Sequence, residues 1–244
     1  MRSTREELPV ARRLSRPPKR RELPIAAVVL STALALGGGL AVIFLLQEQL
    51  QLRFWGPPPV AGINARPDFQ GRLLGHFPYG EADVSQLVEL APGLALSRDA
   101  ATAYEQMRSA AEADGVQLTV ISAFRPIAMQ KDIFFGVKSE RNQSAEERAR
   151  VSAPPGYSEH STGLALDLGD EGMPQTNLSE SFEGTPAFFW LQNNAHRFHY
   201  QLSFAKGNRQ GVSYEPWHWR FEGSAQALQQ FEAAIHFNQS RGPF

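Results

Sequence analysis

The sequence contains no cysteine among its 244 residues. This absence excludes disulfide bonds, thiolate metal sites and cysteine nucleophiles, and a chain without thiols tolerates oxidising surroundings well. The sequence also lacks a GxSxG elbow and a P-loop. Nothing therefore indicates serine acyl-enzyme chemistry of the elbow type or nucleotide chemistry.

The chain has little net charge, −1, but the charge is unevenly distributed. Residues 1–23 contain eight Lys or Arg and three Glu, a net charge of +5, so the remainder carries −6. A mildly acidic body argues against nucleic acid as a partner. At this length the chain can form one well-buried domain with additional segments.

The N-terminal third is organised as a basic tail, an apolar span and a proline-rich spacer. Residues 1–23 are rich in arginine and proline, and we expect a cytoplasmic tail there. Residues 24–46 carry no charge and are long enough to cross a bilayer as a helix. The basic residues precede this span, which places the N-terminus in the cytoplasm and the body outside, in the periplasm or the cell-wall space. Three successive prolines at 57–59 indicate a stiff stalk over 47–70.

The apolar span permits a second interpretation. The segment Ala33-Leu34-Ala35 offers small residues at which a signal peptidase could cleave, but it lies inside the apolar run. Retention as an anchor and removal as a signal peptide both export the body.

The body, residues 71–244, shows alternating helix and strand patterns. We predict helices over 97–114, from 126 to about 135, over 144–150, over 185–197 and over 225–237, and strands over 116–122, 199–204 and 211–221. Residues 73–92 show no assignable pattern, and 170–184 is predicted to be a long surface loop. Helices interspersed with short strands predict an α+β fold with a small antiparallel sheet flanked by helices.

The stretch SEHSTGLALD, residues 158–167, carries a histidine and an aspartate that are candidate metal ligands. On a regular strand the spacing of His160 and Asp167 would place them on opposite faces. They converge if His160 lies in the loop before the strand and Gly163 bends the backbone. Alone, a loop histidine and a strand-end aspartate are more often structural.

A second stretch, YEPWHWRF at residues 214–221, supplies Glu215 and His218. Two histidines and one carboxylate are the protein ligands of a catalytic zinc site, which leaves a fourth position for water. A further glutamate nearby would accept a proton from that water. On a regular strand Glu215 and His218 would lie on opposite faces, so Pro216 must distort the backbone where the strand begins. The structural alternative is an edge strand with packed tryptophans and a surface histidine.

Arg125 follows an apolar strand in the segment SAFRP and therefore requires a partner. It forms either an ion pair with a carboxylate of the body or a bidentate clamp for a substrate carboxylate.

These segments resemble the zinc D-alanyl-D-alanine carboxypeptidases of the VanY type. SEHSTGLALD and EPWHWRF resemble the family's SxHxxGxAxD and ExxH signatures, and SAFRP followed by Gln130 resembles a third block. All three occur in the same order, over about residues 70–223. One departure is His199, where relatives often carry glycine.

The resemblance implies a small α+β zinc-peptidase fold and one Zn²⁺ held by His160, Asp167 and His218. It implies Glu215 as the catalytic base and Arg125 as the anchor for the terminal carboxylate. It also implies that Gln130, Ser158 and Trp217 line the substrate pocket. The expected reaction is removal of the C-terminal D-alanine from peptidoglycan stem peptides. An L,D-carboxypeptidase, an endopeptidase on the same peptides and a non-catalytic metal-stabilised wall-binding module remain alternatives.

Overall fold

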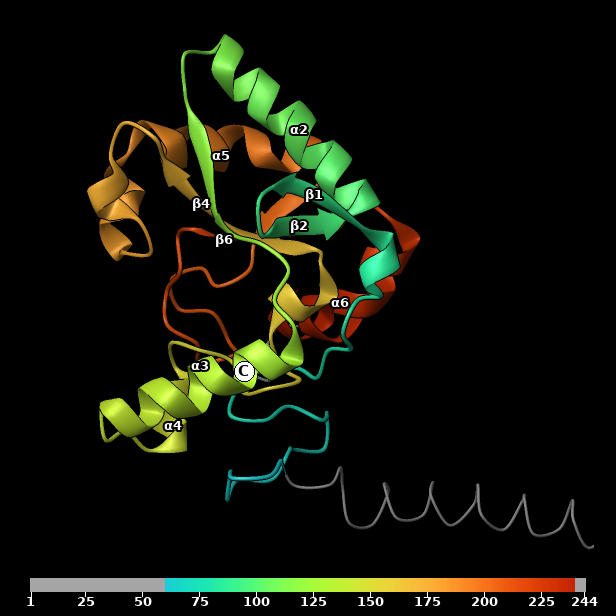
Figure 1. Cartoon of the computed structure of the whole chain (residues 1–244), viewed down its shortest axis with the longest axis vertical. Coiled ribbons are helices and arrows are strands. Elements are labelled where there is room, and N and C mark those ends of the chain that lie inside the picture. Colours follow the sequence, from blue (N-terminus) through green and yellow to red (C-terminus); the bar gives the residue numbers. More distant parts are fainter. Residues whose placement is uncertain (1–59, 240–244) are drawn as a thin grey trace, which may run out of the picture. The chain divides into compact units, whose positions relative to one another are not determined.

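The computed structural model describes residues 60–239 (Figure 1). The predicted tail at 1–23, the apolar span at 24–46 and the first part of the stalk lie outside these residues. Within 60–239, no helix combines the length and the apolar character needed to cross a membrane.

A four-stranded antiparallel sheet forms the centre of the fold, in the order β3-β4-β6-β5. Its strands are β3 (Leu118–Ser122), β4 (Ala165–Asp170), β6 (His218–Phe221) and β5 (Tyr200–Leu202). Strand β4 is buried at every position, since β3 and β6 pair with its two edges and helix α5 (Pro186–Asn194) packs against it. The predicted α+β class with a small antiparallel sheet is confirmed.

The register of this sheet brings distant residues into one row. Asp167 on β4 pairs with Ser122 on β3 on one side and with His218 on β6 on the other. Directly opposed residues in antiparallel strands lie close together. The sheet therefore places Asp167 beside His218, although 50 residues separate them in the sequence.

Helix α2 (Arg98–Ala113) packs against β3 and against a hairpin of β1 (Leu87–Ala91) and β2 (Leu94–Ser97). Its buried residues follow a helical period: Ala100, Ala101, Ala103, Tyr104, Met107 and Ala111. Ser97 is its N-cap residue, at the start of the helix predicted over 97–114. The hairpin was not predicted from the sequence, because β1 and β2 are short and, apart from the buried Leu96, their residues are partly buried or exposed.

Helices α3 (Ile127–Glu140) and α4 (Ala145–Ala149) form a separate lobe, at the opposite end of the view from α2 (Figure 1). The helix predicted over 144–150 begins with a capping box: Ser144 Oγ accepts from the Glu147 amide, and the Glu147 carboxylate accepts from the Ser144 amide. A second apolar cluster, Ile63, Leu73, Phe134, Ala145, Ala149 and Tyr157, holds this lobe together. Ile63 falls within the predicted stalk, yet it is buried in this cluster, so the packed unit includes that part of the segment.

The C-terminal half contains short 3₁₀ helices and two longer helices. These are η2 (Glu159–Thr162), η3 (Pro174–Thr176), η4 (Glu180–Gly184), α5 (Pro186–Asn194), η5 (Ala195–Phe198) and α6 (Ala225–Gln239). The strand predicted over 211–221 is much shorter in the structure. Before His218 the chain leaves the sheet: the Ser213 amide donates to the Arg150 carbonyl and the Glu215 amide to the Phe204 carbonyl.

His199 ends η5 in the left-handed conformation, with φ at 60°. This backbone costs a residue with a Cβ about 1–2 kcal/mol, whereas glycine adopts it freely. The His199 side chain is exposed. We therefore expect His199→Gly to raise the free energy of unfolding by up to about 1 kcal/mol, because the backbone strain that is relieved outweighs the added conformational entropy of the unfolded chain. Urea denaturation at fixed pH would measure this, and a loss of stability would contradict it.

Candidate active site

His160 lies on η2, immediately before β4. The helix ends at Gly163, whose φ of 67° is left-handed and where a Cβ would approach Leu87 Cδ2 to 2.8 Å. Gly163 therefore makes the turn that returns His160 towards Asp167, as the sequence predicted. His160 Nδ1 donates to the Ala123 carbonyl at 2.8 Å, which leaves Nε2 facing Asp167 Oδ2 at 3.3 Å. The tautomer with a free Nε2 lone pair is thus fixed by a backbone contact.

His218 lies on β6 and contacts two carboxylates through its two ring nitrogens. Nδ1 is 3.1 Å from Asp167 Oδ1, and Nε2 is 2.9 Å from Glu159 Oε2. Burial lowers the pKa of His218, but the hydrogen bonds and charges of Asp167 and Glu159 outweigh burial and raise it to about 10. The two carboxylates therefore favour a positive charge at this position.

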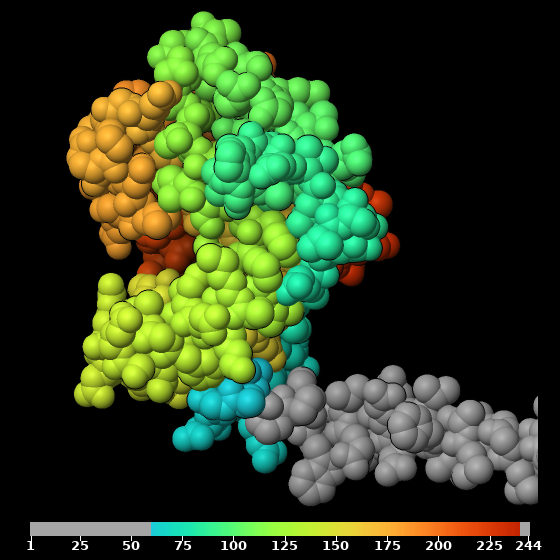
Figure 2. Space-filling model, viewed as in Figure 1, coloured from blue at the N-terminus to red at the C-terminus, as the bar shows by residue number. Residues whose placement is uncertain are grey.

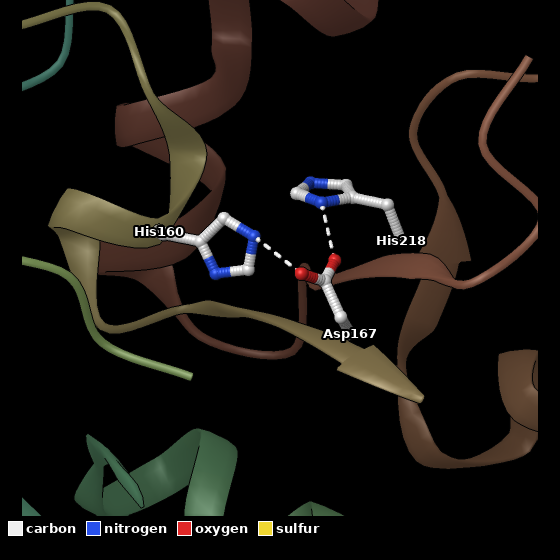
Figure 3. Close-up of side chains that lie close together, drawn as sticks. All are labelled: His160, Asp167 and His218. Carbon is white, nitrogen blue, oxygen red and sulfur yellow. Dashed lines mark hydrogen bonds and ion pairs between the residues drawn. The ribbon is translucent and has the colours of Figure 1, made fainter. Parts of the chain in front are cut away.

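Asp167 lies between the two histidines and is buried (Figure 3). Its two oxygens face different rings, Oδ2 towards His160 and Oδ1 towards His218 (Figure 3). Burial raises the pKa of Asp167, but the neighbouring histidines more than offset this and hold it well below its usual range. The group is therefore an ionised carboxylate in a largely dry site.

These three residues form a group that can hold a metal ion. One donor atom from each of His160, Asp167 and His218 lies within 4.8 Å of the others, and all three side chains are buried. Two nitrogens and one carboxylate oxygen match the ligand set of a catalytic zinc centre. Across residues 60–239, no other group of three such side chains meets this condition.

Glu215 lies beside this group because a turn precedes β6. The His218 amide donates to the Glu215 carbonyl at 3.1 Å, which brings Glu215 Oε2 to 3.9 Å from His218 Nδ1. The turn contains Pro216. Because of it, Glu215 and His218 do not lie on one regular strand, which would place their side chains on opposite faces. Burial raises the pKa of the Glu215 carboxyl to about 7. Such a group is suited to accept and return a proton near neutral pH.

Arg125 projects towards the same group from the loop after β3. Its Nη2 donates to Ser122 Oγ at 2.8 Å and lies 3.9 Å from Asp167 Oδ2, and its Nη1 donates to Gln130 Oε1 at 2.9 Å. The guanidinium is only partly buried, so donors remain available on its exposed side.

Gln130 was predicted to line the pocket, but the structure places it behind Arg125. It is fully buried, and its amide nitrogen donates to the Ala153 carbonyl at 2.7 Å and to Ser152 Oγ at 3.2 Å. Its amide oxygen accepts from Arg125. Gln130 therefore positions Arg125 and joins it to the segment that follows α4.

A cleft of about 590 Å³ opens over these groups. The metal-ligand candidates line it together with Glu215, Arg125, Ser158 and Trp217. Figure 2 shows a hollow on this side of the molecule, between the α3–α4 lobe and the segment around residues 170–185. The structure thus places the predicted residues Ser158 and Trp217 on the wall of the cleft.

Glu159 is a residue that the sequence interpretation missed. It is buried, and besides His218 it accepts from Ser203 Oγ at 2.5 Å and pairs with Arg220 Nη1 at 3.0 Å. A carboxylate behind a ligand histidine fixes the orientation of the ring and raises its basicity. The signal was Arg220, which shares a strand face with His218 and would need a carboxylate when buried.

The fold and the buried group of two histidines and a carboxylate are consistent with a carboxypeptidase, and the comparisons with known proteins support this class. Residues 93–224 match the family model "VanY: D-alanyl-D-alanine carboxypeptidase". The chain therefore belongs to the VanY family of D-alanyl-D-alanine carboxypeptidases, and the resemblance noted in the sequence is confirmed.

Two curated relatives are similar over part of their length. The putative carboxypeptidase YodJ of Bacillus subtilis is 34% identical over 136 residues, covering 54% of this chain and 48% of the relative. A D-alanyl-D-alanine carboxypeptidase of Enterococcus faecalis is 33% identical over 128 residues, covering 49% of this chain and 45% of the relative. The matched regions thus span about half the length of these relatives.

Three solved structures share the fold. The LD-carboxypeptidase LdcB has a TM-score of 0.53 at 28% identity, over 67% of this chain and 77% of its own. VanYB in complex with D-alanine-D-alanine has a TM-score of 0.52 at 26% identity, over 68% of this chain and 94% of its own. A D,D-pentapeptidase VanY mutant in complex with Zn(II) has a TM-score of 0.51 at 25% identity, over 67% of this chain and 89% of its own.

Proposed function

We propose that this chain is a zinc metallopeptidase that removes the C-terminal D-alanine from peptidoglycan stem peptides. The observation that carries the proposal is the buried group of His160, Asp167 and His218 with Glu215 beside it. Similarity to VanYB bound to D-alanine-D-alanine supports the substrate class.

The three buried ligand candidates suit one zinc ion per chain. The hydrogen bond from His160 Nδ1 to a carbonyl and that of His218 Nε2 with Glu159 leave one nitrogen of each ring for the ion. The ionised carboxylate of Asp167, which faces both rings, favours a cation beside it. A zinc ion bound there would supply Lewis acidity and lower the pKa of bound water to about 7.

The side chains of this chain divide the remaining tasks. Glu215 accepts a proton from the attacking water and returns it to the leaving amine. Arg125, held by Ser122 and Gln130, pairs with the terminal carboxylate of the peptide. This pairing fixes the register of the substrate, so that only the last residue is removed.

Hydrolysis of the bond between an L-residue and a terminal D-alanine is the second candidate, favoured by the similarity to the LD-carboxypeptidase LdcB. An endopeptidase would not need the positioned Arg125. A non-catalytic wall-binding module would not need a buried carboxyl at Glu215.

The proposed location is the outer side of the cytoplasmic membrane, where stem peptides are found. It rests on the uncharged span 24–46 as a single membrane anchor and on the basic residues that precede it, all outside the described residues. The substrate and the membrane are thus the two proposed partners.

We expect the detergent-solubilised full chain to release free D-alanine from a synthetic stem pentapeptide when zinc is present. Release from the tetrapeptide, measured in parallel, would identify the L,D-activity. A chelator should abolish release and added zinc should restore it, because the site depends on the ion.

An amino-acid analysis of both reactions measures the outcome. Release that survives complete removal of metal would refute the zinc mechanism. No release from either peptide by zinc-loaded protein would refute the carboxypeptidase proposal and favour a binding module.

A further inference from the structure

Arg148 on α4 is a buried arginine that has no anionic partner within residues 60–239. It is 7% exposed, its Nε has no hydrogen-bond partner, and no carboxylate within residues 60–239 lies in ion-pair distance of its guanidinium. Burial lowers the pKa of Arg148, and the charge of nearby Arg141 lowers it further. A buried unpaired charge is costly, so this site is incomplete without an anion.

Arg220, the other buried arginine among the described residues, shows the contrast. Arg220 is 5% exposed and pairs with two carboxylates, Glu159 at 3.0 Å and Glu222 at 2.7 Å. Arg148 has a comparable degree of burial and none of this compensation.

Arg148 faces the same cleft as the metal-ligand candidates. Arg148 and Arg141 line the cleft on the side of the α3–α4 lobe, which borders the hollow in Figure 2. Glu180 also lines the cleft but lies beyond ion-pair distance of Arg148 in the described chain. An anion that enters the cleft would therefore find two guanidinium groups with no competing ion pair.

Two aromatic contacts link the chain segment that carries Arg148 to His218. The Phe204 ring lies 5.0 Å from the His218 ring and 6.1 Å from the His76 ring, and His76 Nε2 donates to the carbonyl of Ala149 at 2.7 Å. Ala149, the next residue after Arg148, is thus linked to His218 through His76 and Phe204, and both Arg148 and His218 line the cleft.

We propose that Arg148, with Arg141 beside it, forms an anion subsite that binds a second carboxylate of the peptide substrate, in the cleft that the metal-ligand candidates also line. The substrate class rests on the proposed function. A stem peptide carries such a group: its glutamate is linked through the side chain and keeps a free α-carboxylate. A guanidinium binds a carboxylate through two parallel hydrogen bonds, which distinguishes the acid from the amide.

Binding of two pentapeptides that differ only in this group tests the subsite. One carries glutamate and the other isoglutamine, and both keep a free C-terminus. Calorimetry would use the zinc-loaded full chain in detergent with Glu215→Ala, which prevents turnover. We expect the acid to bind about tenfold more tightly or better, the gain of a hydrogen-bonded charge pair. Adding Arg148→Gln to the Glu215→Ala protein should bring the ratio of its affinities for the acid and the amide peptide close to one.

Arg150→Gln is the matched control. Arg150 lies two residues further on, is exposed and does not line the cleft, so its loss removes the same charge and should preserve the ratio. If Arg148→Gln fails to fold, Arg148→Lys keeps the charge and should retain a reduced preference.

Equal affinities of the parent protein for acid and amide would overturn the subsite. So would an equal loss for both peptides in Arg148→Gln, because Arg148 would then bind the shared terminal carboxylate or act only on the fold. Turnover by the unsubstituted chain is measured separately. If neither peptide is cleaved, the proposed function fails, while the affinity ratio still decides whether the subsite exists.

Discussion

Glu215→Gln is expected to lower kcat for D-alanine release by about 10²–10⁴-fold. The amide has the same shape as the carboxyl, but it cannot accept a proton from water. Because Glu215 lies 3.9 Å from His218 Nδ1 and is not one of the three ligand candidates, bound zinc should remain near one ion per chain. Kinetics on the pentapeptide and metal analysis of the dialysed protein would measure both quantities.

Glu180→Gln is the control for a loss of negative charge in the cleft. Glu180 lines the same cleft but is exposed and lies away from the metal-ligand candidates, so kcat should change by no more than a few-fold. Full activity in Glu215→Gln would refute its role as base. Loss of zinc from that variant would show instead that Glu215 supports the metal centre.

Much of the site could be predicted because its chemistry is local in sequence. His160, Gly163 and Asp167 lie within one decapeptide, and the need for a bend at Gly163 follows from strand parity alone. The capping box of α4 is equally local. In each case the interacting residues are neighbours along the chain, so spacing carries the information.

Contacts that depend on the packing of distant segments could not be predicted. The register that opposes Asp167 to His218 is set by the whole sheet, and the orientation of Gln130 by the segment after α4. The prediction of a strand over 211–221 is wrong for most of its length. The Ser213 amide donates to the carbonyl of Arg150, at the end of α4, and Pro216 lies in a turn. Alternating residues describe a possible strand, but they do not supply its partner.

The hairpin of β1 and β2 was missed for a different reason. Apart from the buried Leu96, its residues are partly buried or exposed, and neither strand shows a clean alternation of apolar and polar side chains. Its position nevertheless matters for the site. The Gly163 carbonyl accepts from the Ser97 amide, and Leu87 leaves no room for a side chain at Gly163. The hairpin thus supports the turn on which His160 depends.

Arg220→Met is expected to lower the free energy of unfolding of the metal-free protein by about 3–5 kcal/mol. The change removes the partner of Glu159 Oε1 and leaves a carboxylate that is 3% exposed without its guanidinium. Burial raises the pKa of Glu159, but Arg220 and His218 together hold it well below its usual range, so the group is charged in the folded protein. Urea denaturation followed by circular dichroism would measure the change.

Arg108→Met provides the control for an arginine whose ion pairs are exposed. Arg108 pairs with Glu105 and Glu112 on the surface of α2, with about two fifths of each side chain accessible, so its loss should cost less than about 1 kcal/mol. The double variant Arg220→Met with Glu159→Gln should recover part of the stability, because the buried charge is removed as well. An effect of Arg220→Met no larger than that of Arg108→Met would contradict the argument. It would mean that Glu159 does not depend on Arg220 for charge compensation, and His218 alone would then balance the buried carboxylate.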